Sequence, residues 1–426
     1  MDAAPKTLLS RYLEVRRRTE RLAEPLSPED QNLQSMPECS PVKWHRAHTT
    51  WFFETFLLGP RGQPPIHPEW GFLYNSYYEA LGPRQSRPQR SLLSRPSAEE
   101  IARWRRQIDE RMAPLLEGLE DREEDAALIP LVELGLAHEE QHQELLLTDV
   151  LNAFSHNALK PAYAPPASDT VPDTPALRSP SDAPVSAMRW LPQEGGLVTR
   201  GASGDGFAFD NERPAHRVFL QPYQLASRLV SVAELKAFIR EGGYHTPSLW
   251  LSEGLEWVRA GGREAPLYGR MEGEAYVVFG LTGEREAGDD EPAVHLSFYE
   301  ADAIATFLGA RLPTEAEWEH VAQALPVEGH LLESGPWHAT PPRGPGPSQL
   351  FGTAWEWTRS AYAPYPGFRP AAGAIGEYNG KFMVHQQVLR GGSYLTPPGH
   401  VRATYRNFWH PHVQFQVTGA RLARDA

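Results

Sequence analysis

The sequence predicts a protein of two domains, an N-terminal four-helix bundle and a C-terminal α+β domain, joined by a proline-rich linker. Residues 5–155 repeat apolar side chains with the 3.6-residue period of amphipathic helices. Residues 158–187 are dominated by proline, serine, aspartate and alanine, and a helix does not tolerate that many prolines. We therefore expect domains at residues 1–157 and 188–426, separated by the linker at 158–187.

Four segments of the first domain have the length and periodicity of bundle helices. They are residues 8–22, 42–59, 97–119 and 125–154. The second ends at Gly59-Pro60, and the third begins at Ser97, whose side chain caps free N–H groups while Glu100 completes a capping box. Pro130 lies in the first turn of the fourth helix or kinks it. The core of such a bundle is a common place for metal sites.

The second domain is rich in glycine, tryptophan and tyrosine, and its apolar segments are short. Strands are predicted within residues 216–226, 274–281 and 387–395, which lie between turn signals. Helices are predicted around residues 231–242 and 297–310. We expect little other helix in this domain.

Charge and composition exclude several classes of function. The net charge is −13, and no run of lysine or arginine forms a tail, which argues against nucleic acid or an anionic membrane as the partner. No apolar run approaches the length of a signal peptide core or a membrane span. Cys39 is the only cysteine, so no intrachain disulfide can form. The sequence predicts a soluble, cytoplasmic protein.

The fourth helix contains the pentapeptide His138-Glu139-Glu140-Gln141-His142, which matches the H-E-x-x-H signature of zinc proteases. Those enzymes need a third ligand downstream, a histidine in an extended motif or a glutamate on the next helix. Neither exists here, because the next glutamate after Glu144 is Glu194, beyond the linker. The protease match is therefore accidental.

His138 and His142 are nevertheless four residues apart on one helix face, close enough to bind one metal ion. A third ligand is available upstream from either His45 or His48 on the second helix, and their spacing alone does not choose between them. A three-histidine face suits non-haem Fe(II) oxygen chemistry, and it also suits a zinc-bound water in a hydrolase.

Longer motifs carry a resemblance to a known family. SPVKWHRAHTTWFFETFLL, LYNSYYEALGPR and AHEEQHQELLLTDVL resemble the DinB-type helical domain of the sulfoxide synthases of ergothioneine biosynthesis, the EgtB family. GFAFDNERPAHRVFL, RLPTEAEWEH, AWEWTRSAY and VLRGGSYLTPPGHVRATYRNFW resemble their C-terminal domain, which is similar to formylglycine-generating enzyme and has a C-type-lectin-like fold. The resemblance covers nearly the whole chain outside the linker.

The resemblance implies a mononuclear Fe(II) enzyme. It would use O2 to join the sulfur of a thiol to C2 of the imidazole of hercynine (N-α-trimethylhistidine), leaving a sulfoxide. The motif positions imply His48, His138 and His142 as the ligands, with His45 outside the ligand set. The chain length and the NSYYEA motif favour the branch of the family that uses cysteine as the thiol.

The same resemblance assigns roles to residues near the metal. Tyr77 and Tyr78 match tyrosines near the iron of the family, where a phenol could supply a proton. Apart from the resemblance, Arg84, Arg87 and Arg90 are spaced by three and could bind the carboxylate of the thiol substrate, because a guanidinium group matches a carboxylate in shape. Arg87, and then Arg84, is favoured for this role. Gln141 matches the glutamine that orients the substrate imidazole.

In the second domain, YRNFWHPHVQF matches the segment that closes the family's pocket over hercynine. Asn407 would hydrogen-bond the amino-acid carboxylate, and Phe408 and Trp409 would face the trimethylammonium group. Members that use γ-glutamylcysteine carry an acidic residue at the position of Trp409, which argues against that donor here. The cysteine pair of formylglycine-generating enzymes is absent, so their activity is excluded.

Three alternatives stay open at the level of sequence. One is a selenoneine synthase, which would use a selenosugar donor in place of a thiol. Another is a zinc-dependent hydrolase or thiol transferase of the DinB type. The third is a binding module whose histidines are structural. The sulfur or selenium donor, the acting tyrosine, the oligomeric state and the partner enzymes are not fixed by the sequence.

Overall fold

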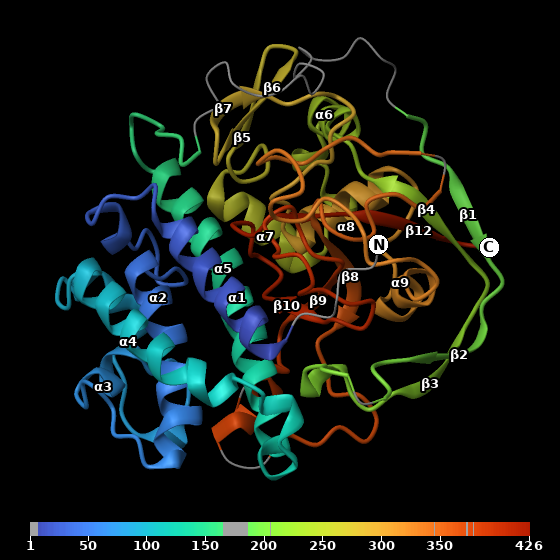
Figure 1. Cartoon of the computed structure of the whole chain (residues 1–426). Helices are drawn as coiled ribbons and strands as arrows, with labels where there is room; N and C mark the ends of the chain where they lie inside the picture. The colour runs from blue at the N-terminus through green and yellow to red at the C-terminus, as the bar shows by residue number, and fades with distance from the viewer. Residues whose placement is uncertain (1–6, 165–185, 205, 345, 372–373, 378) are drawn as a thin grey trace. The chain divides into compact units, whose positions relative to one another are not determined.

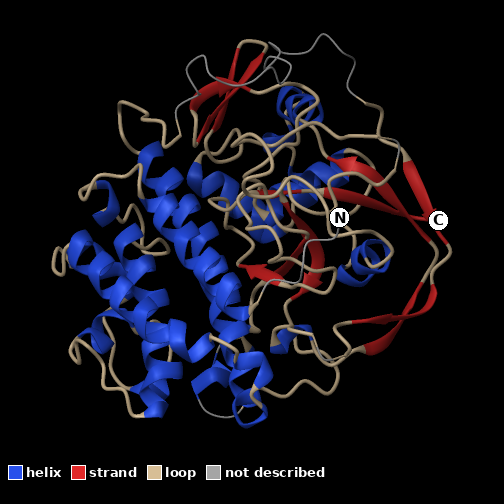
Figure 2. Cartoon of the chain, viewed as in Figure 1, coloured by secondary structure: helices blue, strands red, loops and turns tan. Residues whose placement is uncertain are grey.

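The computed structural model describes residues 7–164, 186–204, 206–344, 346–371, 374–377 and 379–426. The chain divides into two compact units. The first holds residues 1–156 together with short segments around Gly206 and Glu377, and the second holds the remainder. Helices dominate the first unit, whereas short strands and long loops dominate the second (Figure 2). The expected division into a helical bundle and an α+β domain is confirmed.

The four long helices of the first unit are those that the sequence predicts (Figure 1). They are α1 (Leu8–Ala23), α2 (Val42–Phe53), α4 (Ala98–Leu116) and α5 (Ile129–Ser155). Ser97 caps α4 and forms the capping box with Glu100. Pro130 lies in the first turn of α5, where its missing N–H removes no hydrogen bond. Local signals in the sequence therefore define the beginnings of α4 and α5.

The second helix differs from its prediction at its C-terminal end. Regular α-helix stops at Phe53, and residues Glu54–Leu58 form a π-helical turn before Gly59. The short helix α3 (Trp70–Tyr74) follows, and a 3₁₀ helix at Arg87–Leu92 precedes α4. These segments form the loop that carries the tyrosine and arginine motifs.

Helix α2 packs against both α4 and α5, and α1 packs against α5. Gly135 lies at the contact between α5 and α2. A Cβ atom there would lie 2.7 Å from Cε1 of Phe53 and 3.0 Å from Cε1 of Phe52. Both phenylalanines are fully buried, so only a glycine allows the two helices to approach this closely at that level.

The described residues of the second unit form four small sheets, and most of their strands are labelled in Figure 1. One sheet has the order β1-β4-β12, formed by Trp190–Gln193, Tyr223–Leu229 and Arg421–Asp425. A second has the order β10-β9-β8-β11, formed by Asn407–Trp409, Gln387–Arg390, Trp355–Ala361 and Thr418–Gly419. The hairpin β2-β3 comprises Gly196–Arg200 and His216–Leu220. The last sheet, β5-β6-β7, comprises Gly269–Glu272, Ala275–Gly280 and Gly283–Glu286.

Where the structure describes the unit, it has two more α-helices than the sequence predicts. The expected pair is present as α6 (Val232–Arg240) and α8 (Phe298–Phe307), each opened by a serine capping box. The additional pair is α7 (Ser252–Gly261) and α9 (Glu315–Ala322). Helix α9 begins at a Thr314 capping box.

Buried ion pairs tie the second unit together. Arg421 and Glu356 are both fully buried and make two parallel hydrogen bonds of 2.8 Å. Arg390 donates one hydrogen bond through Nη2 to Glu319, and both side chains are fully buried. Such pairs are stable only where geometry and further hydrogen bonds compensate for lost hydration. They anchor β9 and β12 in the core.

Residues 165–185 of the expected linker lie outside the described residues. The preceding part is attached to the second unit, since the backbone N–H groups of Tyr163 and Ala164 donate to the Leu281 carbonyl. None of the helices in the described ranges is long and apolar enough to cross a bilayer.

Candidate metal centre

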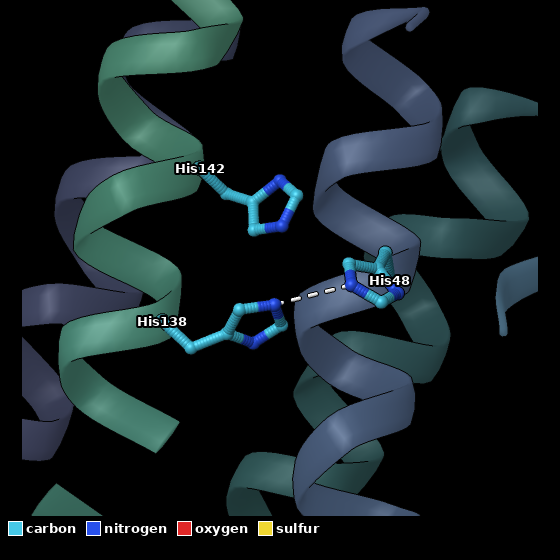
Figure 3. A group of neighbouring side chains, drawn as sticks. All are labelled: His48, His138 and His142. Carbon is cyan, nitrogen blue, oxygen red and sulfur yellow. Dashed lines mark hydrogen bonds between the residues drawn. The ribbon is translucent and has the colours of Figure 1, made fainter. Parts of the chain in front are cut away.

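Three histidines from two helices converge in the first unit (Figure 3). His48 comes from α2, and His138 and His142 come from successive turns of α5. One ring nitrogen from each lies within 4.8 Å of the other two. The Nε2 atoms of His48 and His138 are 3.1 Å apart. This arrangement is a possible three-histidine metal site, and its third member is His48, the alternative that the resemblance indicated.

Burial gives these imidazoles the protonation state that binds metals. His48 and His138 are almost completely buried, and His142 is half-buried. Burial lowers the pKa of His138 to about 3 and holds the pKa values of His48 and His142 well below their usual range. The rings are therefore neutral at physiological pH, with a lone pair free for a cation.

The second ring nitrogen of His48 also has a hydrogen-bond partner. Its Nδ1 lies 2.6 Å from the backbone carbonyl oxygen of Tyr74, which can only accept a hydrogen bond. The proton of His48 is thus on Nδ1, and Nε2 carries the lone pair that faces His138. Metal-ligating histidines usually have such a partner on the nitrogen opposite the ion. The donor set fits a transition-metal ion with a preference for imidazole, such as iron or zinc.

Two tryptophans of α2 enclose His48. Trp44 stacks on one face at 4.5 Å between ring centroids, and Trp51 stacks on the other at 5.6 Å. The spacing of Trp44, His48 and Trp51 places them on one helix face. The rings exclude water and fix the orientation of His48, a role that sequence analysis did not assign to either tryptophan.

Glu139 points away from the histidine cluster into the bundle core. Its carboxylate accepts from Arg16 at 2.9 Å, from Arg105 at 2.7 Å and from the Thr19 hydroxyl at 2.6 Å. Burial alone would raise the pKa of Glu139, but the two guanidinium groups outweigh it and lower the pKa to about 2. A carboxylate held in this way cannot serve as the general base of a zinc protease. This excludes the role that the H-E-x-x-H motif would give to Glu139.

Tyr78 lies one ring away from His48. Its ring packs against Trp51 at 5.7 Å between centroids, and Trp51 in turn stacks on His48. Tyr78 is fully buried, and burial raises the pKa of its phenol, which stays protonated at neutral pH. The Tyr77 hydroxyl is 3.5 Å from that of Tyr78, and the Tyr77 side chain is half-buried.

The three arginines of the loop before α4 differ in environment. Arg84 pairs with Glu79, and the exposed Arg87 donates to the backbone carbonyl of Glu38. Arg90 is only 3% exposed, and its guanidinium carbon lies 3.4 Å from the centre of the Trp44 ring. The sequence favours Arg87 and then Arg84, yet Arg90 is the arginine whose guanidinium group lies against the Trp44 ring beside the histidines.

Arg90 has hydroxyl partners in place of a carboxylate. It donates to the Ser40 hydroxyl at 2.8 Å and to the Ser76 hydroxyl at 3.3 Å. Among the described residues, no carboxylate lies within ion-pair distance of Arg90, and its Nε has no hydrogen-bond partner. Burial, reinforced by Arg87, lowers the pKa of Arg90, although the nearby Asp149 acts in the opposite direction. This position therefore favours binding of an anion.

The remaining predicted site residues are placed as follows. Gln141 is half-buried and directly precedes His142 on α5. Asn407, Phe408 and Trp409 form β10 in the second unit, and all three are half-buried. Because neighbouring strand residues point to opposite faces, Phe408 and Trp409 cannot both present their rings to one cation. Phe408 stacks on Tyr362 at 3.9 Å between centroids, whereas Trp409 contacts Phe415 and shares its strand face with Asn407.

Both units match known protein families. Residues 11–146 match the DinB superfamily, and residues 177–329 and 326–426 match the sulfatase-modifying factor enzyme 1-like domain. The hercynine oxygenase of Mycolicibacterium smegmatis is 31% identical, and the match covers 99% of this chain and 99% of that protein. The hercynine oxygenase of Mycobacterium tuberculosis is likewise 31% identical, with 99% of each chain covered.

The chain belongs to the hercynine oxygenase family. The family resemblance that the sequence motifs indicated is thus confirmed over the full length of the chain. A formylglycine-generating enzyme of Streptomyces coelicolor is 27% identical but covers only 60% of this chain. Membership of this family makes the protein an oxygenase. Its histidine cluster is a possible metal site for that activity.

Proposed function

We propose that this protein is an Fe(II) enzyme that joins the sulfur of cysteine to C2 of the hercynine imidazole. The reaction consumes one O2: hercynine and the thiol each lose one hydrogen, one oxygen atom enters the sulfoxide and the other leaves as water. The observation that carries the proposal is the cluster of neutral histidines in a bundle of the hercynine oxygenase family. His48, His138 and His142 would hold the iron, and iron supplies the redox chemistry that activates O2.

Arg90 is proposed to bind the carboxylate of the sulfur donor, with Arg87 beside it. A buried guanidinium group without a carboxylate partner is strongly stabilised by an anionic ligand. Cysteine provides such a carboxylate. A selenosugar does not, so the environment of Arg90 supports the amino-acid donor over the selenoneine synthase alternative. Arg84 is already paired with Glu79 and is given no direct role.

The family motifs suggest hercynine-binding residues in each unit, and the two sets are proposed separately. Gln141, next to His142, is proposed to orient the imidazole. Trp409 would face the trimethylammonium group, because a cation without N–H donors is recognised best by an aromatic face. Asn407 shares the strand face of Trp409 and would bind the amino-acid carboxylate. Phe408, which stacks on Tyr362, would support the strand from its other face.

Tyr77 is proposed as the proton donor near the reacting atoms. Tyr78 is fully buried, whereas Tyr77 is half-buried and can meet a substrate. The 3.5 Å distance between the two hydroxyls lets Tyr78 orient Tyr77. A positioned acid of this kind accelerates a reaction by about 10²- to 10⁴-fold.

The proposal is tested by anaerobic reconstitution of the full chain with Fe(II), followed by addition of O2, hercynine and one donor at a time. The donors are cysteine, γ-glutamylcysteine and a selenosugar, and the products are identified by mass spectrometry. We expect hercynyl-cysteine sulfoxide, with one O2 consumed for each molecule formed. A product only with the selenosugar would overturn the donor assignment. Turnover of an ester or amide without O2 would instead support a zinc-type hydrolase.

Single substitutions test the ligand set. Replacing His48, His138 or His142 by alanine should abolish Fe(II) binding, because two imidazoles hold the ion poorly. Arg84→Ala serves as the control and should bind Fe(II) as the native protein does. Retention of iron by His48→Ala would remove this residue from the ligand set.

A further inference from the structure

His142 has a hydrogen-bond partner on the side opposite the cluster. Figure 3 shows one ring nitrogen of His142 directed toward His48 and His138. Its other ring nitrogen, Nδ1, lies 2.8 Å from Nδ1 of His45. His45 is only 3% exposed, so no bulk water competes for this contact.

A carboxylate extends this contact further. Nε2 of His45 lies 3.0 Å from Oδ2 of Asp149, which is 6% exposed. The same oxygen accepts from the backbone N–H of Ser40 at 2.7 Å. A continuous chain therefore runs from Asp149 through His45 to His142, and both ring nitrogens of His45 are used in it.

The order of donors and acceptors in this chain follows from its end. An ionised carboxylate only accepts hydrogen bonds, so Nε2 of His45 carries the proton that points at Asp149. In a neutral His45 the other nitrogen, Nδ1, then has the lone pair and accepts a hydrogen bond from Nδ1 of His142. His142 is consequently protonated on Nδ1, which leaves its Nε2 lone pair directed at the cluster.

Helix geometry explains how two helices supply this chain. His45 lies three residues before His48 on α2, and Asp149 lies seven residues after His142 on α5. Spacings of three and seven residues keep side chains on nearly the same helix face. The contact between α2 and α5 therefore builds both the ligand cluster and its support.

We propose that His45 is a positioning residue, which links His142 to Asp149 and fixes the tautomer in which Nε2 of His142 faces the metal. This inference rests on the proposed metal centre. His45 is not itself a ligand, and it acts only through the hydrogen bond to His142. The carboxylate of Asp149 at the end of this chain would also offset part of the positive charge of a bound metal ion, which neutral imidazoles do not.

The test compares four variants of the full chain. His45→Leu removes both hydrogen bonds, whereas His45→Asn keeps an acceptor oxygen near the position of Nδ1. Asp149→Asn removes the charge that orients His45. His156→Leu is the control, because it also removes one imidazole, but at an exposed position just after α5.

Metal-free protein is titrated with Co(II), whose visible absorption reports both affinity and ligand geometry. Loss of a partner that orients a ligand typically lowers metal affinity by about 10- to 100-fold. We expect losses of this size for His45→Leu and Asp149→Asn, a smaller loss for His45→Asn and no change for His156→Leu. Native affinity in His45→Leu would overturn the inference while leaving the metal centre intact. Failure of the native protein itself to bind Co(II) would instead refute the proposed function.

A second measurement uses the native protein, so it does not depend on whether the variants fold. Long-range ¹H–¹⁵N NMR spectra of the metal-free native protein, labelled with ¹⁵N-histidine, identify the tautomer of each ring. We expect His142 to be protonated on Nδ1 and His45 on Nε2. A His142 ring protonated on Nε2 would contradict the proposed chain.

Discussion

Replacing Glu139 by glutamine should destabilise the helical unit without removing its metal site. The carboxylate is completely buried, and its two guanidinium partners, Arg16 and Arg105, are each 2% exposed. Removing one partner of a buried ion pair costs about 3–5 kcal/mol. Arg16 keeps Asp109 at 2.7 Å and Arg105 keeps Glu20 at 2.6 Å, so we expect the lower end of this range.

The assay is urea or thermal unfolding of the full chain, followed by the helical circular dichroism signal. For a helical domain of this size, a loss of about 3 kcal/mol lowers the midpoint of thermal unfolding by about 6–12 °C. Glu133→Gln is the matched control on the same helix, since Glu133 pairs with the exposed Arg11 and such surface pairs contribute about 0–1 kcal/mol. Unchanged stability of Glu139→Gln, accompanied by loss of bound metal, would refute the structural role of Glu139.

The effect of Glu139→Gln should also depend on pH. The pKa of Glu139 falls from 4.5 to about 2 on folding, so the folded state binds this proton less readily than the unfolded state. Its stabilisation is therefore complete above about pH 4.5 and is lost as the pH falls toward 2. The difference in stability between native protein and variant should be constant near neutral pH and shrink across that acid range. A difference that grows on acidification would contradict the assignment.

Three further predictions concern the substrates. Arg90→Met should raise the KM for cysteine by about 10- to 150-fold, because it removes a buried charge-assisted hydrogen bond. The KM for hercynine should stay nearly unchanged, and Arg84→Met is the control in the same steady-state assay. Trp409→Ala should reduce the preference for hercynine over histidine by about 5- to 30-fold, as measured by competitive binding, whereas Phe408→Leu should not. Tyr77→Phe should lower kcat by about 10²-fold or more with native Co(II) affinity, and an unchanged kcat would exclude Tyr77 as the proton donor.

The sequence predicts the helical unit well because its signals are local. Capping residues such as Ser97 and the periodic apolar positions define α1, α4 and α5 to within a few residues at most ends. The end of α2 is different. Residues 54–58 continue the apolar pattern of the helix, so periodicity does not reveal that the turn widens to π-helical geometry there.

The candidate metal site is predictable only in part for a physical reason. His45 and His48 lie three residues apart on one helix, and the tertiary contact with Asp149 separates the two roles. Arg90 and Glu139 are likewise charged residues that a sequence pattern would place on the surface. Their burial depends on partners far away in the chain, such as Arg16 for Glu139.

The second unit is harder to predict because its elements are short and long-range contacts position them. Helix α7 spans the sequence SEGLEWVRAG, in which two glycines weaken the helical signal. Helix α9 is only 8 residues long, and Trp318 on it donates to Glu356 of β8 at 2.8 Å. Local periodicity around α9 does not reveal that Glu356, which lies farther along the chain, is its partner.

Gly135 limits how this protein can be made more heat-resistant. Exchanging a glycine inside a long helix for alanine is a standard stabilising change, because helix propensity improves by about 1 kcal/mol. At Gly135 the added methyl group would press on Phe52, whose ring centroid lies 5.0 Å from that of His138. A displaced Phe52 ring would in turn shift the imidazole of His138, a proposed iron ligand. A variant library for thermostability should therefore keep glycine at this position, because any side chain there would push against the phenylalanines of α2.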